Sequence, residues 1–456
     1  MDWTEYNDSL GRVLIPRQSY YGPQTQRARE NFPISGMGLP RELISAVALI
    51  KQCAAQTNRE FGLLPPDKAE AVIQAAAEIL SGGFADQFVV DVFQTGSGTS
   101  TNMNVNEVIA VRANEILTGT KQFKTPVHPN DHVNLCQSSN DVIPSAIHIA
   151  ALSAMRKRLM PCLLRLWGSL VDKSKEFNEI WKIGRTHLQD AVPITLGQEF
   201  SGYARQMELG LERLEGPADR LRFLALGGTA VGTGLNAHPG FAARTIARIA
   251  AATGIDFRET ANHFEAQAAC DTAVETSGQL KTLAMGLMKI ANDIRWLSSG
   301  PRCGLGEIIL PSLQPGSSIM PGKVNPVIPE AVMQVCAQVA GNDTTIALAG
   351  GGGTFELNTM LPVIAHNLMQ SITILANAAE VFAAKCIEGI AADRERCEQN
   401  IEKSLALVTH LVPYIGYDKA AEIARKAFET GKTVKTVALE EGIMAKDEIN
   451  RLFSVQ

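Results

Sequence analysis

The sequence predicts an all-α protein built around a central bundle of long helices. Aromatic residues make up only 6% of the 456-residue chain, while alanine and leucine dominate its long segments, and this composition favours helix. Apolar residues also recur every seven positions through the middle of the chain, which is typical of long helices packed at shallow angles. We expect three regions: a mixed helix and loop domain at 1–138, a five-helix bundle at 139–390, and a small helical domain at 391–456.

The elements follow in order from these patterns. Residues 1–138 are punctuated by proline, glycine and asparagine, which interrupt regular structure. The first bundle helix is expected from Val142 to about Val171, with Pro144 and Pro161 at its start or at a kink. Seven-residue repeats predict the other four helices, through Phe200, Met207, Leu214 and Leu221; Leu280, Leu287 and Ile294; Val332, Val339 and Ile346; and Leu361, Leu368, Leu375 and Phe382.

Some of these helices are apolar on more than one side. Ala284, Met285 and Met288 lie beside the repeat that begins at Leu280. A helix that is apolar beyond one stripe buries more than one face. The pattern fits the core of a large monomer, but it favours packing against other subunits, because one five-helix bundle has a limited interior.

Composition and charge exclude several classes of function. The net charge of -5 and the pI of about 6.0 leave no basic excess to neutralise a nucleic acid. The acidic, polar N-terminus does not resemble a targeting peptide, and no apolar run is long enough to predict a membrane span. The eight cysteines are scattered without CxxC spacing, so we expect buried thiols, no metal site and a cytoplasmic protein.

Four polar segments interrupt the helical scaffold, at residues 95–107, 128–141, 184–190 and 316–326. Neither GxGxxG nor GxxxxGK[ST] occurs in them, so a nucleotide cofactor is not expected. Singly, each has an ordinary structural explanation. Residues 138–140 would cap the helix that follows, His187 would be a core histidine, and Lys323 would be a surface charge.

Taken together, the four segments predict a binding site for a small dicarboxylate. They supply hydroxyls, amides, one histidine and one lysine, without metal-ligand spacing. Backbone N–H groups and Ser, Thr and Asn side chains suit carboxylates, and a lysine supplies charge. Gly316 and Gly322 would let the last segment turn its N–H groups inward and close over a substrate.

The last segment, "GSSIMPGKVNP", resembles the signature loop of the fumarase/aspartase superfamily. The segments "TGSGTSTNMNVNEV", "HPNDHVN", "QSSND", "GRTHLQDAVPITLGQE" and "GGTAVGTGLN" are similar to those of class II fumarate hydratases, in the same order. The resemblance covers essentially the whole chain. It implies an all-α homotetramer with a twenty-helix core, no metal or other cofactor, and active sites that each draw on three subunits.

The resemblance also implies the reaction, which is the reversible hydration of fumarate to (S)-malate through an aci-carboxylate intermediate. Ser317 matches the catalytic base of the family, His187 the residue that handles the water, and Glu330 the carboxylate partner of that histidine. The residues that match substrate-binding positions are Ser97, Gly98, Thr99, Ser138, Ser139, Asn140, Thr186, Ser318, Lys323, Val324 and Asn325.

A second dicarboxylate site near the surface is implied by the same resemblance. The chain departs from the family pattern there, because His132 stands where many relatives have an aspartate. The residues that match this second site are His128, Pro129, Asn130 and Asp131.

Three alternatives to a fumarate hydratase remain open. Aspartate ammonia-lyases share the loop, but they typically have glutamine at the position of His187. A hydratase of a methylated fumarate is also compatible, since one methyl group changes discrimination by only about 1–3 kcal/mol. The third alternative is a structural protein on the same fold, like the lens crystallins related to the superfamily.

Overall fold

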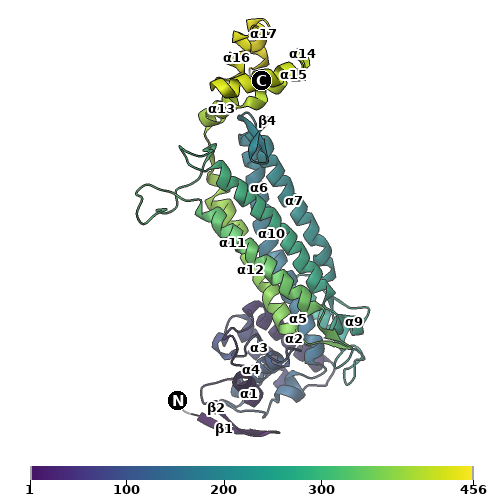
Figure 1. Cartoon of the computed structure of the whole chain (residues 1–456). Coiled ribbons are helices and arrows are strands. Elements are labelled where there is room, and N and C mark those ends of the chain that lie inside the picture. The colour runs from purple at the N-terminus through teal and green to yellow at the C-terminus, as the bar shows by residue number, and fades with distance from the viewer. Residues whose placement is uncertain (1–2, 454–456) are drawn as a thin grey trace. The chain divides into compact units, whose positions relative to one another are not determined.

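The computed structural model describes residues 3–453 (Figure 1). The chain forms two compact units. The first unit comprises residues 1–161, 212–284 and 336–376, and the second comprises residues 162–211, 285–335 and 377–456. The long helices contribute residues to both units, while the division into three domains stays a prediction.

The all-α prediction is confirmed, and the long helices occur where the repeats indicated. Within each unit, segments of these helices lie side by side (Figure 1). They are α5 (Ser139–Ala154), α6 (Met160–Glu176), α7 (Leu196–Arg220), α10 (Asp271–Leu297), α11 (Val327–Gly350) and α12 (Leu361–Lys385). Helix α5 continues into α6. None of the described helices is both long enough and apolar enough to cross a membrane.

The predicted apolar repeats are the buried faces of these helices. All four residues of the α12 repeat are at most 1% exposed, and those of the α7 repeat are equally buried. Hydrogen bonds between polar side chains add specificity within each unit. In the first unit Ser277 donates to Asp343 across 2.8 Å, and in the second unit Tyr203 donates to Asp293 across 3.0 Å.

Leu368 on α12 provides a test of this packing. Its side chain is fully buried, so Leu368→Ala leaves a cavity and is expected to lower the free energy of unfolding by about 3 kcal/mol. Urea denaturation followed by circular dichroism measures the change. Leu10→Ala, at a side chain that is 78% exposed, is the control, and equal losses in the two variants would contradict the assignment of Leu368 to the core.

The expected kink at Pro161 is present as a wider helical turn. Residues Met155–Leu159 form a π-helical turn between α5 and α6. Proline has no N–H group, and its ring would clash with the carbonyl four residues earlier in a regular α-helix. The π turn just before Pro161 relieves this conflict and lets the helix continue.

Each unit also contains shorter elements. The first unit also contains β1 (Trp3–Asp8), β2 (Gly11–Pro16), α1 (Pro23–Asn31), α2 (Arg41–Glu60), α3 (Pro66–Leu80), α4 (Thr99–Thr118), α8 (Phe241–Thr253) and α9 (His263–Ala268). The second unit also contains β3 (Trp181–Thr186), β4 (Gln189–Thr195), β7 (Ile308–Ile309), α13 (Arg394–Lys403), α14 (Val412–Ile415), α15 (Tyr417–Thr430), α16 (Val434–Glu440) and α17 (Lys446–Leu452).

Two features differ from the expectations. The hairpins β1–β2 and β3–β4 were not expected, because their short strands show too little alternation between apolar and polar residues. The expectation that all cysteines are buried is wrong for Cys303, which is exposed, and for Cys162, which is half-buried. Cys303 follows a proline and an arginine in an irregular segment, where the backbone runs on the surface.

Candidate functional site

The segment 316–326 forms a closed loop in the second unit, just before α11. The Gly316 N–H donates to the Lys323 carbonyl across 2.7 Å, and the Asn325 side-chain amide donates to the Gly316 carbonyl across 2.6 Å. A Cβ atom on Gly316 would lie only 2.5 Å from the Lys323 carbonyl oxygen. Glycine is therefore required for the two ends of the loop to approach each other.

The hydroxyl of Ser317 lies inside a turn of backbone donors. Its Oγ accepts hydrogen bonds from the N–H groups of Ile319, at 3.2 Å, and Met320, at 3.0 Å. Backbone N–H groups that converge on one oxygen stabilise negative charge on it. A serine in this geometry loses its proton more readily than one whose oxygen faces only solvent.

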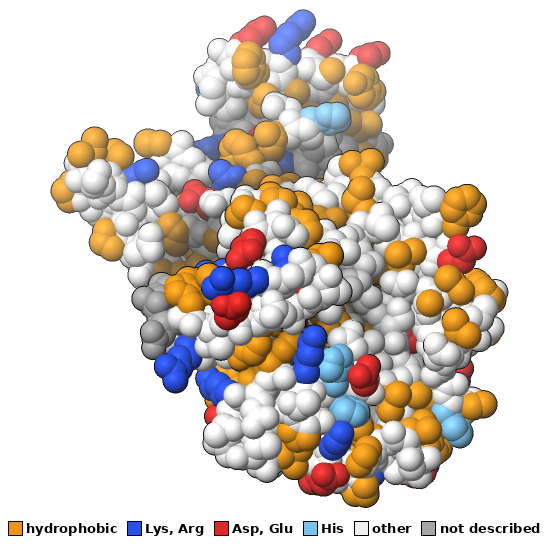
Figure 2. Space-filling model, turned by 90° about the horizontal axis from the view of Figure 1, so that it is seen from below, with side chains coloured by type: hydrophobic (Ala, Val, Ile, Leu, Met, Phe, Trp, Pro, Cys, Tyr) orange, Lys and Arg blue, Asp and Glu red, His pale blue; other side chains and the backbone are white. Residues whose placement is uncertain are grey.

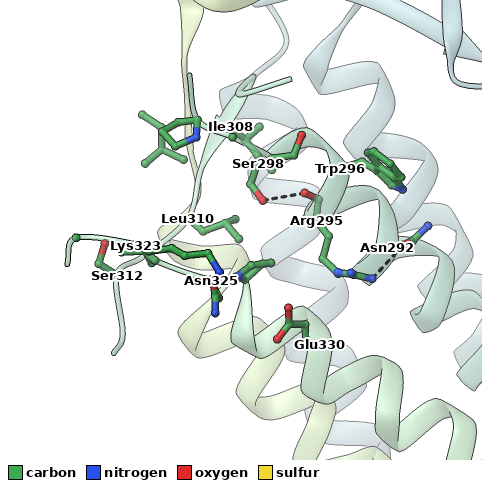
Figure 3. Close-up of a pocket in the computed structure, with 17 residues that line it drawn as sticks. Asn292, Arg295, Trp296, Ser298, Ile308, Leu310, Ser312, Lys323, Asn325 and Glu330 are labelled. Atoms are coloured by element: carbon green, nitrogen blue, oxygen red, sulfur yellow. Dashed lines mark hydrogen bonds between the residues drawn. The ribbon is translucent and has the colours of Figure 1, made fainter. Parts of the chain in front are cut away.

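A cavity of about 670 Å³ adjoins the loop (Figure 3). It is lined by four of the predicted residues, namely Lys323, Val324, Asn325 and Glu330. Glu330 lies in the first turn of α11, where an acidic side chain faces the positive end of the helix dipole. The Lys323 ammonium, the Asn325 amide and the Glu330 carboxylate therefore belong to one concavity, which could take a small ligand.

The sequence interpretation missed two residues of this cavity. Asn292 and Arg295 project from α10, and the Arg295 guanidinium donates to the Asn292 side chain across 3.4 Å. Figure 3 shows Arg295 and Glu330 extending toward the same space from different helices. The spacing of three positions, which places both residues on one face of a helix, was the available signal.

His187 lies at the tip of the hairpin formed by β3 and β4, also in the second unit. His187 and Leu188 form the two-residue turn and both have left-handed backbones, with φ of 57° and 60°. The His187 side chain is exposed, so the alternative of a core histidine is wrong. Thr186, the preceding residue, is exposed as well.

The pairing of His187 with Glu330 is not made within a single chain. Among the described residues, no hydrogen bond or ion pair joins the two side chains, although both belong to the second unit. An orienting carboxylate must lie within hydrogen-bonding distance of the histidine ring. If the pair forms, its members therefore come from different subunits or meet after a rearrangement.

In the first unit, two helix N-termini meet at a chain of hydroxyls. The Thr99 hydroxyl, at the start of α4, lies 2.7 Å from the Ser97 hydroxyl and 2.6 Å from that of Ser139, the first residue of α5. Gly98 precedes α4 with φ of 72°, a conformation that glycine adopts without strain. Hydroxyls beside two helix N-termini suit a carboxylate, since both helix dipoles present their positive ends.

The expected helix cap at residues 138–140 is confirmed. Ser138 and Asp141 form a capping box at the start of α5. Its N–H groups are therefore partly engaged within the chain, and the Asn140 side-chain amide donates to the Ala230 carbonyl across 2.8 Å. The hydroxyls of Ser97, Thr99 and Ser139 remain the groups best placed to meet a ligand.

A buried lysine that the sequence interpretation missed supports this pair of helix N-termini. Lys51 on α2 is 0% exposed, and its ammonium donates to the side chains of Asn134 and Gln137, at 2.9 Å each. Asn102 on α4 donates to the same Asn134 oxygen across 3.2 Å. Lys51 thereby joins α4 to the segment that leads into α5. The signal was a single lysine in an otherwise apolar stretch, "AVALIKQCAA".

The Lys51 ammonium has an abnormal titration that can be measured. Burial lowers its pKa from the ordinary 10.5 to about 7, against a smaller opposing effect of Asp141. Between these two values the unfolded chain retains a proton that the folded protein has released. The contribution of Lys51 to stability therefore rises with pH in this window, by up to about 1.4 kcal/mol per unit, and is constant below it.

We expect Lys51→Met to abolish this rise. The free energy of unfolding in urea is measured for the wild type and the variant from about pH 6 to about pH 9, and the variant value is subtracted from the wild-type value. The difference should increase with pH above about 7. Parallel pH profiles for the two proteins would show that Lys51 titrates normally.

The residues that match a second dicarboxylate site lie at a surface of the first unit. Pro129–Val133 form a π-helical turn, and the His128 Nδ1 accepts from the N–H groups of Asn130 and Asp131, at 3.2 Å each. His132, the departure from the family pattern, lies 3.3 Å from the Lys68 ammonium. Burial lowers the pKa of both histidines. Figure 2 shows histidines beside basic and acidic side chains on one face of the molecule.

The chain is similar in sequence to known proteins over nearly its whole length. The family model described as Lyase matches residues 11–341, and the model described as Fumarase C C-terminus matches residues 407–456. Fumarate hydratase class II of Nitrosomonas europaea is 55% identical over 98% of this chain and 97% of its own length. The corresponding protein of Thermosynechococcus vestitus is 53% identical over 97% and 95%, respectively.

The fold of the chain is also similar to that of a solved structure. The crystal structure of class II fumarase from Schistosoma mansoni superposes with a TM-score of 0.95 at 38% identity, and covers 99% of this chain and 98% of its own. The chain belongs to the class II fumarate hydratase family of lyases.

Proposed function

We propose that the chain catalyses the reversible, stereospecific hydration of fumarate to (S)-malate. The observation that supports this reaction most directly is the Ser317 hydroxyl, which accepts two backbone N–H groups at 3.2 and 3.0 Å. It lies in the same loop as Lys323 and Asn325. A base beside a cation and an amide is the arrangement that proton removal next to a carboxylate requires.

In the malate direction the reaction has two steps. The Ser317 alkoxide takes a proton from the carbon next to one carboxylate, and the electron pair moves into that carboxylate to give the aci form. Lys323 and Asn325 stabilise this doubly charged group. The intermediate then expels the hydroxyl group from the neighbouring carbon, with a proton from His187, to give fumarate and water.

The hydroxyls at the two helix N-termini would hold the substrate. Ser97, Thr99 and Ser139 provide donors for a carboxylate, with Gly98, Ser138 and Asn140 beside them, while Thr186, Ser318 and Val324 would complete the contacts from the hairpin and the loop. Held in this way, a dicarboxylate presents a carbon–hydrogen bond to Ser317. The second site at His128–Asp131 would bind the same class of anion.

We also propose that the protein is a homotetramer in which each active site uses three subunits. Large apolar side chains on the long helices are exposed in the single chain, including Leu348 at 76% and Leu164 at 52%. Exposed apolar surface of this kind is usually covered by a partner. Association would also let His187 of one subunit meet Glu330 of another. Light scattering during size-exclusion chromatography tests this, and a monomer that is fully active would contradict it.

Loss of ultraviolet absorbance from the fumarate double bond tests the function. Purified protein is mixed with fumarate alone and with fumarate plus ammonium. A fall without ammonium supports the hydratase, while a fall that requires ammonium indicates an ammonia-lyase. If absorbance stays constant in both mixtures, the protein is a hydratase of a methylated fumarate or a structural protein. The same assay with methylated fumarate distinguishes these two alternatives. A cytoplasmic location is proposed because the eight cysteines are scattered without CxxC spacing.

A further inference from the structure

A buried cluster of charges lies beneath the hairpin that carries His187. It consists of Lys182 and Arg185 on β3, Glu199 at the start of α7, and Glu307 just before β7. We call these four residues the hairpin clamp. Glu307 is 0% exposed and the Lys182 side chain only 1%. Each of these buried charges must therefore be stabilised by the other charge and by neighbouring polar groups.

Glu307 is the centre of the hairpin clamp. The Arg185 guanidinium donates to both of its carboxylate oxygens, at 2.7 and 2.9 Å. The Lys182 ammonium lies 3.3 Å from Glu307 and 3.1 Å from Glu199, and the Asn400 amide donates to Glu307 across 3.1 Å. Two cations and two anions balance, and the two-pronged arginine contact fixes orientation as well as distance.

A bulge in β4 lies opposite this part of β3. The strand register shifts between Ile183 and Arg185. Ile183 pairs with Pro193 and Arg185 pairs with Asp190, so two residues of β4 lie opposite the single residue Gly184 of β3. A Cβ atom on Gly184 would lie 2.8 Å from the Val192 carbonyl oxygen, which explains the glycine opposite the bulge.

The hairpin clamp holds a turn with an unfavourable backbone. His187 follows Arg185 by two residues, and His187 and Leu188 both have positive φ without being glycine. Such conformations persist only where the surroundings hold them in place. The side chain of Arg185 is the last one of β3 anchored in the interior before the turn, since Thr186 and His187 are exposed.

We infer that Glu307 is a positioning residue for the reaction. Through Arg185 it fixes the strand that carries His187, and so sets the place from which the histidine handles water, without touching the substrate. Only the role of Glu307 in the reaction rests on the proposed function. The rigidity of the hairpin is a property of the protein alone.

The test compares two variants that weaken the contact in different ways with a matched control. Glu307→Gln removes the charge, and Arg185→Lys retains the charge but removes the two-pronged geometry. Glu199→Gln makes the same chemical change within the hairpin clamp and leaves the Arg185–Glu307 contact in place. Hydrogen exchange of peptides covering residues 181–195, followed by mass spectrometry, is measured beside kcat and KM.

We expect hairpin amides to exchange about 10-fold faster in Glu307→Gln and in Arg185→Lys, with kcat lowered about 10-fold or more and KM nearly unchanged. Glu199→Gln should stay within about threefold of wild type in each measurement. Unchanged exchange and kcat in Arg185→Lys would overturn the inference, even if Glu307→Gln fails to fold. Equal losses in Glu199→Gln would also overturn it, by indicating general destabilisation. An inactive wild type would contradict the proposed function, while the exchange comparison would stand.

Discussion

Replacing Ser317 with alanine is expected to lower kcat for both directions of the reaction by about 10³-fold, with a much smaller effect on KM. The two backbone N–H groups that point at the Ser317 oxygen would then face a methyl group. Among residues 3–453, no other hydroxyl of the loop accepts hydrogen bonds from these two N–H groups. The loop should still close, because its ends are joined through Gly316, Lys323 and Asn325 instead.

Two measurements separate loss of the base from loss of the loop. The first is the rate at which the malate hydrogen next to the carboxylate exchanges with deuterium oxide, which reports proton removal alone and should vanish in Ser317→Ala. The second is activity of Ser9→Ala, at an exposed serine between β1 and β2, which should remain within about threefold of wild type. Undiminished exchange in Ser317→Ala would show that another group removes the proton.

Replacing His187 with glutamine is expected to lower kcat by about 10²–10⁴-fold through loss of proton transfer to the leaving hydroxyl group. Glutamine keeps a hydrogen-bonding side chain of similar reach but cannot gain or lose a proton in the reaction. The exposed position of His187 at the hairpin tip makes misfolding of the variant a minor concern.

The deuterium measurement gives His187→Gln a signature that Ser317→Ala lacks. Because Ser317 still removes the proton, exchange into malate should continue while formation of fumarate nearly stops, so the ratio of exchange to turnover rises. His410→Gln, a change at another histidine, should leave both rates within about threefold. A kcat for His187→Gln within about tenfold of wild type would assign the water-handling step to another residue.

The sequence predicted the long helices well because heptad repeats depend on local geometry. Side chains seven positions apart lie on one face of a helix, so repeats such as Leu361 to Phe382 indicate the buried face without knowledge of the partner. The cap at Ser138 and the acid at Glu330 were equally local, since both depend on the first turn of a helix.

The candidate site could be predicted as a set of residues but not as a geometry. Lys51 and Glu307 were missed because each acts through partners that are remote in the sequence. Glu307 lies 122 positions from Arg185, and no local pattern indicates that the two side chains meet. The strained turn at His187 was hidden for a different reason, since Leu188 is not a residue type that favours positive φ.

By itself, the sequence determined the helical class, the buried faces of the long helices, and the residue types of a dicarboxylate site, because each depends on spacing along the chain. Only the tertiary structure decided which of these groups meet. It joined the hydroxyls of Thr99 and Ser139, and anchored the His187 hairpin on Glu307. Contacts of this kind depend on how distant segments pack, and packing is a property of the whole fold.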